Sequence, residues 1–119
     1  MSKVLVVDDD PVIITLLQVN FEMEGYDVIT AANGEEGLAQ AHAGHPDIIV
    51  SDVMMPKMDG LAFAAALKAQ PDLAGIPIIL LSAKAQAADV EAGLADADDY
   101  VTKPFNPLEL LERVATLLS

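Results

Sequence analysis

The chain has 119 residues, of which 53% are apolar, and a formal net charge of −13 at neutral pH. This length predicts one domain, residues 1–119, with enough apolar side chains to bury a core. An acidic surface repels nucleic-acid phosphates, and no apolar run is long enough to cross a bilayer, so we expect neither nucleic-acid nor membrane binding. The lack of cysteine excludes thiolate chemistry. We expect no signal peptide ahead of the first strand. Together with the lack of cysteine, this favours a cytoplasmic location.

Strand and helix patterns alternate along the whole chain, which is typical of an α/β fold with right-handed crossovers. The predicted strands cover residues 4–7, 26–31, 48–52, 78–82 and 100–102. Helices are predicted between Asp10 and Gly25, from Asn33 to Gly44, from beyond Gly60 to about Gln70, from about Ala83 to Leu94, and after Asn106. Their limits follow from capping residues, glycines and prolines.

The end of the chain carries clear local signals. The proline after Lys103 makes a cis peptide bond accessible there. Asn106 is placed as the N-cap of the last helix, and Glu109 stands where a capping box would need it. The buried stripe of that helix is predicted to be Leu111, Val114, Ala115 and Leu118.

Four of the predicted strands end in reactive polar side chains. In chain order these are Asp8, Asp9 and Asp10, then Asp52, then Ser82, then Lys103. Continuous β-branched runs are typical of parallel strands buried on both faces, and such sheets bind ligands at the carboxyl ends of their strands. We therefore expect carboxylates, a hydroxyl and an ammonium to meet in one crevice, a combination suited to a hard divalent cation and a phosphoryl group.

Each of these residues also has a plainer interpretation. Asp8 and Asp9 repel each other unless a cation such as Mg²⁺ binds, but they also fit a solvated turn. Asp52 is a candidate nucleophile for an acyl phosphate, or a turn aspartate. Ser82 is placed either to donate a hydrogen bond to a phosphoryl oxygen or to cap the fourth helix. Lys103 is placed either to bind a phosphoryl group as a point charge or to lie on the surface without a role. Their order at successive strand ends makes the set specific.

Four strings of the sequence resemble the response-regulator receiver domain of two-component signalling, of the single-receiver chemotaxis or sporulation type. The strings, which span nearly the whole chain, are VLVVDDDP, DIIVSDVMMPKMDG, PIILLSA and DDYVTKPF. The resemblance implies a doubly wound, flavodoxin-like (βα)5 fold with a five-stranded parallel sheet in the order 2-1-3-4-5. It also implies that a sensor histidine kinase or phosphotransfer protein donates a phosphoryl group to Asp52.

The resemblance further implies a metal site beside the phosphoacceptor. Asp9 and Asp52 are implied to ligate Mg²⁺, which Mn²⁺ can replace, through their carboxylates. Met54 is implied to do so through its backbone carbonyl, and Asp8 through a water. Self-phosphorylation and self-dephosphorylation are implied, in place of conventional enzyme turnover.

Signalling is implied to depend on a second group of residues. Ser82 and Lys103 are implied to act as catalytic residues on the phosphoryl group. Tyr100 matches the aromatic that changes rotamer with Ser82, so that the face made by helix four, strand five and helix five controls a downstream partner or output domain. Met54 and Lys84 flank the path of attacking water, and neither activates it, so we expect a moderately long-lived phosphorylated form. A monomer or a phosphorylation-dependent dimer is expected.

Two positions depart from the family pattern. Asp96 stands where many members have glycine, so the turn into the last strand is expected to differ. Leu108 stands where DNA-binding members often have an arginine that pairs across a dimer. Their symmetric dimer is therefore in doubt for this chain, although Asp98 and Asp99 remain.

Two other functions stay open from the sequence alone. An acidic triplet after an apolar strand also fits a haloacid-dehalogenase-like phosphatase, with Asp8 as nucleophile and Asp10 as acid and base. Such enzymes usually carry a further cap, for which this chain has little room. The other alternative is a pseudo-receiver, a binding module that never takes a phosphoryl group, and the complete set of site residues argues against it.

Overall fold

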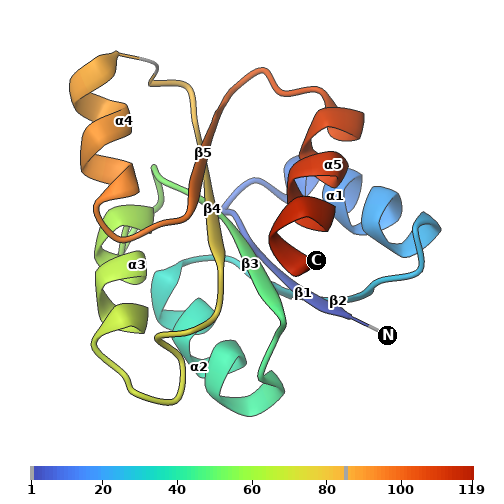
Figure 1. The fold of residues 1–119 in the computed structure, drawn as a ribbon, viewed down its shortest axis with the longest axis horizontal. Helices are drawn as coiled ribbons and strands as arrows, with labels where there is room; N and C mark the ends of the chain where they lie inside the picture. The colour runs from blue at the N-terminus through green and yellow to red at the C-terminus, as the bar shows by residue number, and fades with distance from the viewer. Residues whose placement is uncertain (1, 85) are drawn as a thin grey trace.

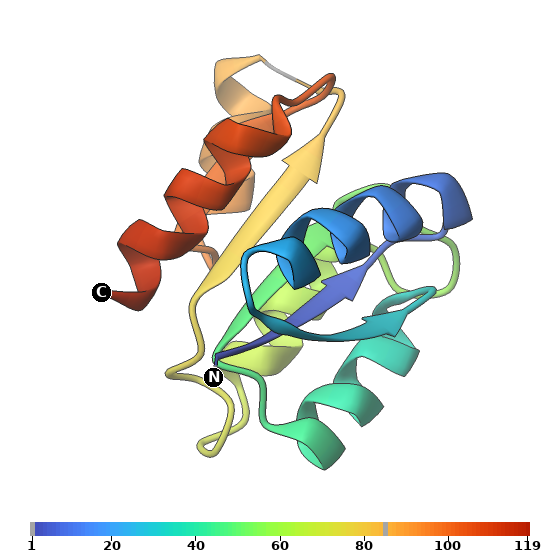
Figure 2. The same cartoon turned by 90° about the vertical axis from the view of Figure 1, so that its right-hand side faces the viewer.

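The computed structural model describes residues 2–84 and 86–119. Five parallel strands form one sheet in the order β2-β1-β3-β4-β5, as the resemblance implied. The strands are β1 (Lys3–Val7), β2 (Asp27–Ala31), β3 (Ile48–Asp52), β4 (Ile78–Ser82) and β5 (Asp99–Thr102). The arrowheads of β1, β2 and β4 point the same way in Figure 2, and because all five strands are parallel, their carboxyl ends lie at one edge of the sheet.

Helices cover both faces of this sheet (Figure 1). They are α1 (Pro11–Met23), α2 (Gly34–Gly44), α3 (Gly60–Lys68), α4 (Ala87–Leu94) and α5 (Pro107–Leu118). Helices α1 and α5 lie on one face, and α2, α3 and α4 lie on the other. Among the residues that the structure describes, no helix has the length and apolarity that a bilayer crossing requires.

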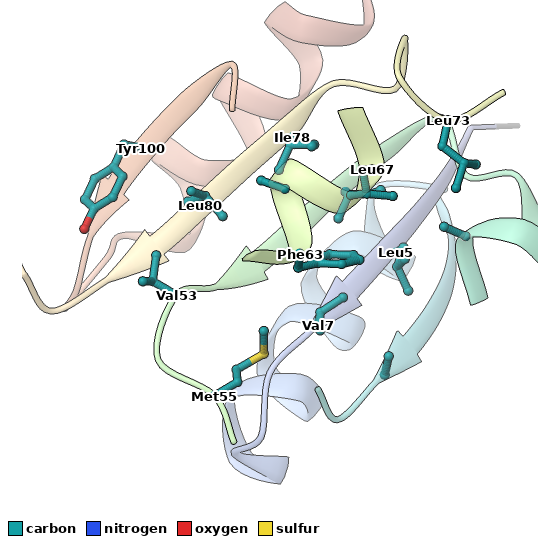
Figure 3. Close-up of a cluster of buried hydrophobic side chains, with 14 residues drawn as sticks. Leu5, Val7, Val53, Met55, Phe63, Leu67, Leu73, Ile78, Leu80 and Tyr100 are labelled. Carbon is teal, nitrogen blue, oxygen red and sulfur yellow. The ribbon is translucent and has the colours of Figure 1, made fainter. Parts of the chain in front are cut away.

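Successive residues of the inner strands face two separate hydrophobic clusters. The α2–α4 cluster (Figure 3) contains the buried residues Leu5, Val7, Ala31, Ala41, Ile49, Val53, Met55, Phe63, Ala64, Leu67, Leu73, Ile78, Leu80 and Tyr100. The α1–α5 cluster contains Val4, Val6, Leu17, Phe21, Ile48, Val50, Ile79, Leu81, Val101, Leu110 and Val114. Because side chains alternate along a strand, a continuous apolar run fills both clusters at once. The inner strands are therefore held rigidly from both sides.

Four of the five helices begin with a side-chain cap, as the sequence predicted for α1, α2 and α5. The side chains of Asp10, Asn33, Asp59 and Asn106 each accept a hydrogen bond from an amide in the first turn of their helix. These bonds satisfy amides that have no partner inside the helix. At the other end of α1, Gly25 has φ +91°, which explains the choice of glycine after that helix.

The structure corrects the expected limits of the fourth helix. Helix α4 begins at Ala87 rather than near Ala83, and its N-cap residue Gln86 makes no side-chain capping bond. Ala85, which the sequence placed inside this helix, lies outside the described residues. Gln86, which precedes the helix, is not one of the usual capping residues, so the alanine-rich composition extended the predicted helix too far.

The last helix also differs in detail from the prediction. Its fully buried residues are Leu110 and Val114, whereas Ala115 is exposed. Glu109 does not serve a capping box as predicted, because its carboxylate pairs with Arg113 at 3.0 Å. The same arginine lies 2.7 Å from Asp99.

The turn into β5 is built without a left-handed residue at Asp96. Among the described residues other than glycine, only His45 and Lys57 have a positive φ. Asp98 instead fastens the start of β5 to β4, since its carboxylate accepts from the Ile78 amide at 2.8 Å and its own amide donates to the Ile78 carbonyl. The aspartate at position 96 is therefore compatible with the fold.

Candidate functional site

Three carboxylates meet at the carboxyl ends of β1 and β3. These strands are neighbours in the sheet, and Val7 pairs in register with Ser51, so the residues that follow them emerge side by side. One oxygen from each of Asp8, Asp9 and Asp52 lies within 4.8 Å of the others. Asp8 and Asp52 are buried and Asp9 is exposed. Three hard oxygen donors in this space fit Mg²⁺, which prefers carboxylates and water as ligands.

Lys103 extends into this cluster from the end of β5. Its Nζ lies 3.3 Å from Asp8 Oδ2 and 3.3 Å from Asp52 Oδ1. The Lys103–Pro104 peptide bond is cis, as the sequence allowed. Only 22% of the lysine side chain is exposed, so the interpretation as a simple surface lysine is wrong. One ammonium thus partly neutralises two buried carboxylates.

The protonation of Asp8 reflects opposing influences. Burial raises the pKa of its carboxyl, and the negative charge of Asp52 raises it further. The Asp10 amide, which donates to Asp8 at 2.9 Å, and the nearby Lys103 lower this pKa without cancelling the rise. The cluster therefore carries more negative charge than its one lysine compensates, which favours a bound cation.

Ser82 lies beside this cluster, at the buried end of β4. It pairs in register with Thr102, and its carbonyl accepts from the Lys103 amide at 2.8 Å, so strand pairing brings Ser82 and Lys103 together. The Ser82 Oγ accepts a hydrogen bond from the Lys84 amide at 3.1 Å. Since Lys84 lies ahead of α4, the hydroxyl shapes the loop that follows β4 and does not cap the helix.

Tyr100 is linked to the same loop. Its hydroxyl donates to the carbonyl of Lys84 at 2.9 Å, and only 9% of the residue is exposed. The ring lies at one end of the α2–α4 cluster, next to Leu80 (Figure 3). The backbone of Lys84 therefore contacts both Ser82 and Tyr100, a connection that no sequence pattern indicates because it uses backbone atoms.

Met54 and Lys84 line one groove, together with Asp59 and Leu61. Met54 is 57% exposed. Two residues far apart in the sequence, one after β3 and one after β4, thus line the same groove. Their role beside the path of attacking water stays a prediction of the family resemblance.

The loop after Asp52 turns back sharply at Gly60, a residue to which the sequence gave no functional role. The Gly60 amide donates to the Val53 carbonyl at 2.8 Å. A Cβ on Gly60 would collide with the carbonyl of Asp52, so only glycine allows this approach. Gly60 therefore helps to fix the backbone around Met54, whose carbonyl is the candidate metal ligand.

Comparison with known proteins identifies the family of this site. The family model described as the response regulator receiver domain matches residues 4–115. The chain belongs to the response regulator receiver domain family. It is therefore a receiver domain of two-component signalling, and receiver domains bind Mg²⁺ at an acidic pocket.

Relatives and solved structures agree with this assignment. The receiver domain is 50% identical over 118 residues to the alkaline phosphatase synthesis transcriptional regulatory protein PhoP of Bacillus subtilis, covering 98% of this chain and 48% of that protein. It spans about half the length of the curated relatives that it matches. A crystallised chemotaxis protein, CheY4 of Vibrio cholerae, is 38% identical with a TM-score of 0.93, over 99% of both chains.

A third similar structure bears on the metal site. The receiver domain of the sensor histidine kinase PA1611 from Pseudomonas aeruginosa is 30% identical with a TM-score of 0.90, over 98% of this chain and 97% of that one. That structure has a magnesium ion coordinated in its active site cleft. The acidic cluster of the present receiver domain offers three carboxylates, a ligand type that Mg²⁺ prefers.

Neither alternative function is favoured. The family match covers nearly the whole receiver domain. Asp10, which a phosphatase of the haloacid-dehalogenase type would need as acid and base, accepts a hydrogen bond from the Val12 amide and caps α1.

Proposed function

We propose that this receiver domain accepts a phosphoryl group on Asp52 from the phosphohistidine of a sensor histidine kinase or phosphotransfer protein. The observation that carries the proposal is the position of Asp52, buried at the end of β3 with Lys103 at 3.3 Å and two further carboxylates beside it. A nucleophile, a fixed positive charge and a set of hard cation ligands are thus present together. These are the requirements of phosphoryl transfer to a carboxylate.

The transfer exchanges one bond to phosphorus for another. A carboxylate oxygen of Asp52 attacks the phosphorus, the P–N bond to the donor imidazole breaks, and the imidazole nitrogen keeps the electron pair. Lys103 approaches the transferred oxygens as a point charge, and Ser82 turns its hydroxyl toward them. Asp9, Asp52 and the Met54 carbonyl would hold Mg²⁺, or Mn²⁺ in its place, with Asp8 acting through a water. A bound Mg²⁺ supplies charge neutralisation at the phosphoryl oxygens.

Switching follows from the hydrogen bonds of the loop after β4. When Ser82 turns toward the phosphoryl group, it releases the amide of Lys84. The carbonyl of the same residue accepts from Tyr100, so the rearranged loop alters the position of that ring. Helix α4, strand β5 and helix α5 form the face that responds, and its two arrangements are the states that a partner distinguishes.

The partner on that face is a downstream protein or an output domain. Several relatives are named as transcriptional regulators and are about twice as long as this chain. A cytoplasmic location suits a domain that receives its phosphoryl group from a kinase. Exposed Leu108 on α5 favours a monomer over the arginine-paired symmetric dimer, and a phosphorylation-dependent dimer is the other possible assembly.

Intact-mass measurement after treatment with acetyl phosphate and Mg²⁺ tests the phosphoacceptor. Wild-type protein should gain one phosphoryl mass that hydroxylamine removes, whereas Asp52→Asn should gain none. The matched control is Asp59→Asn, which removes another carboxylate from the loop after β3. An unchanged adduct on Asp52→Asn would contradict the assignment, and an adduct lost only in Asp8→Asn would favour the phosphatase-like alternative.

A further inference from the structure

The ring of Tyr100 lies against the backbone of Gly93 in α4, at a point where no side chain fits. A Cβ added to Gly93 would lie 2.5 Å from Cδ2 and 2.7 Å from Cε2 of Tyr100. It would also lie 3.4 Å from Cδ1 of Leu80. Real Cβ atoms essentially never approach other heavy atoms within 3.0 Å. The inward position of the ring therefore requires glycine at residue 93.

The backbone conformation of Gly93 does not itself require glycine. The residue is buried within α4, and its φ is not positive. Alanine is a much stronger helix former than glycine, so local helix propensity argues against the residue that is present. What glycine contributes here is space for the Tyr100 ring.

A hydrogen bond holds the same ring from its other end. The Tyr100 hydroxyl donates to the Lys84 carbonyl at 2.9 Å, and the Lys84 amide donates to Ser82 Oγ at 3.1 Å. The ring thus lies in a slot that is bounded by Gly93 of α4 on one side and by the loop at Lys84 on the other. Gly93 belongs to helix α4, which supplies none of the three carboxylates of the acidic cluster.

We propose that Gly93 is a positioning residue of the switch, because its missing side chain keeps open the slot that the Tyr100 ring occupies. A side chain at residue 93 turns the ring outward and breaks its hydrogen bond to Lys84. It thereby disconnects the α4–β5–α5 face from phosphorylation at Asp52, a consequence that rests on the proposed function. The residue at position 93 then sets the balance between the two positions of the ring.

Fluorine NMR of protein labelled with 3-fluorotyrosine reads the ring directly. The chain has two tyrosines, and Tyr26, whose ring lies 5.9 Å from that of Phe21 in an edge contact, serves as internal reference. Gly93→Ala should move the Tyr100 signal toward that of solvent-exposed fluorotyrosine and leave the Tyr26 signal in place. The control is Gly75→Ala, where an added Cβ meets nothing within 4 Å. An unmoved Tyr100 signal in Gly93→Ala would overturn the proposal.

A double-mutant cycle separates the steric contact from general damage to the helix. In the wild-type background, Gly93→Ala should lower the midpoint of thermal unfolding. In the Tyr100→Ala background the same change should raise it, because relief of the contact leaves only the helix preference for alanine, roughly fivefold in the folded-to-unfolded ratio. Equal effects in both backgrounds would overturn the proposal. If Gly93→Ala alone does not fold, folding restored in the double variant supports it, and a double variant that also fails to fold overturns it.

Acetyl phosphate and beryllofluoride distinguish this proposal from the phosphoacceptor proposal. Gly93→Ala should still gain one phosphoryl mass, since Gly93 makes none of the contacts described for the acidic cluster. Its amide shifts on adding beryllofluoride and Mg²⁺ should no longer reach α4, and shifts that extend through α4 as in wild type would contradict the role of Gly93. Wild-type protein that gains no phosphoryl mass would count against Asp52 alone, and the double-mutant cycle would still decide the role of Gly93.

Discussion

Lys103 Nζ lies 3.3 Å from Oδ1 of Asp52, and this contact ties the end of β5 to the end of β3 across the intervening strand β4. The same ammonium lies 3.3 Å from Asp8 Oδ2. A single cation therefore offsets two buried carboxylates that repel each other. Both the stability of the domain and its chemistry depend on this position.

Replacing Lys103 should expose that repulsion. Lys103→Gln is expected to lower the free energy of unfolding by about 1–2 kcal/mol at pH 7 in chelator. This is less than the usual cost of breaking a fully buried pair, because the lysine side chain is partly exposed. Urea denaturation measures it, with Lys57→Gln as a control that removes the same charge from an exposed position. A Lys103→Gln variant as stable as Lys57→Gln would show that the contact contributes nothing to folding.

Asp8 should give stability a specific pH dependence. Because burial raises the pKa of Asp8, the folded chain binds its proton more tightly than the unfolded chain, and this contribution to stability is lost as pH rises through the raised pKa. Asp8→Asn keeps an acceptor for the Asp10 amide. It should be more stable than wild type at pH 7 in chelator, by on the order of 1 kcal/mol. The gain should disappear below about pH 3.9, where aspartate is protonated in both states. A gain that is constant with pH would point to a cause other than ionisation.

Mg²⁺ should stabilise the domain through the acidic cluster. At ten times its dissociation constant, a ligand that binds only the folded state adds about 1.4 kcal/mol. The saturable rise in melting temperature with Mg²⁺ should therefore be absent or strongly weakened in Asp9→Ala. It should persist in Asp27→Asn, which removes an exposed carboxylate at the opposite edge of the sheet. An equal rise in Asp9→Ala would remove Asp9 from the ligand set.

Transmission to the α4–β5–α5 face should require the Ser82 hydroxyl. Adding beryllofluoride and Mg²⁺ to wild-type protein is expected to shift amide signals from the acidic cluster through the loop at Lys84 to α4 and α5. In Ser82→Ala the shifts should stop at the cluster, because no hydroxyl moves between the phosphoryl group and the Lys84 amide. Thr116→Ala removes a hydroxyl from the exposed surface of α5 and should respond like wild type. Shifts in wild type that stay within the cluster would rule out the mechanism.

The lifetime of the phosphorylated form should depend on Met54 and Lys84, which line one groove. Met54 offers no strong hydrogen bond to an incoming water, and protonated Lys84 has no acceptor for its proton. Met54→Asn and Lys84→Glu should each speed the loss of the phosphoryl group, by roughly tenfold, below the effect of a fully positioned general base. Decay followed by intact mass measures both. If both variants keep the phosphoryl group as long as wild type, the two side chains have no part in hydrolysis.

The strand ends were predictable from the sequence because two simple patterns coincide there. Val4–Val7 and Ile48–Val50 are apolar runs too short for helices. A carboxylate that directly follows a buried parallel strand lies at the carboxyl end of the sheet, where such sheets bind their ligands. Asp8 and Asp52 therefore had to lie close together once the strands were paired. Their pairing order came from the family resemblance, since apolar runs alone do not specify neighbours.

The loop and helix after β4 were less predictable, and the reasons are physical. The alanine-rich segment from residue 83 offers no periodic polar face, so the start of α4 at Ala87 left no trace in the pattern. The link between Ser82 and Tyr100 runs through the amide and carbonyl of Lys84. Because every residue has these backbone groups, the identity of residue 84 does not indicate the link. The Glu109 carboxylate had two suitable partners, the Asn106 amide of a capping box and the Arg113 guanidinium one turn later. It pairs with the charged Arg113.

The burial of β1, β3 and β4 on both faces divides the chain into parts with different freedom to vary. Residues that aim Asp8, Asp52 and Ser82 are enclosed by side chains on two sides, so most replacements there would disturb the chemistry. The outward surfaces of α1 and α5, with exposed residues such as Val12 and Leu108, supply none of the three carboxylates of the acidic cluster and are open to redesign. A protein engineer can therefore keep the residues at the strand ends and change the exposed surfaces of these helices, which would give the domain a new recognition surface with the same chemistry.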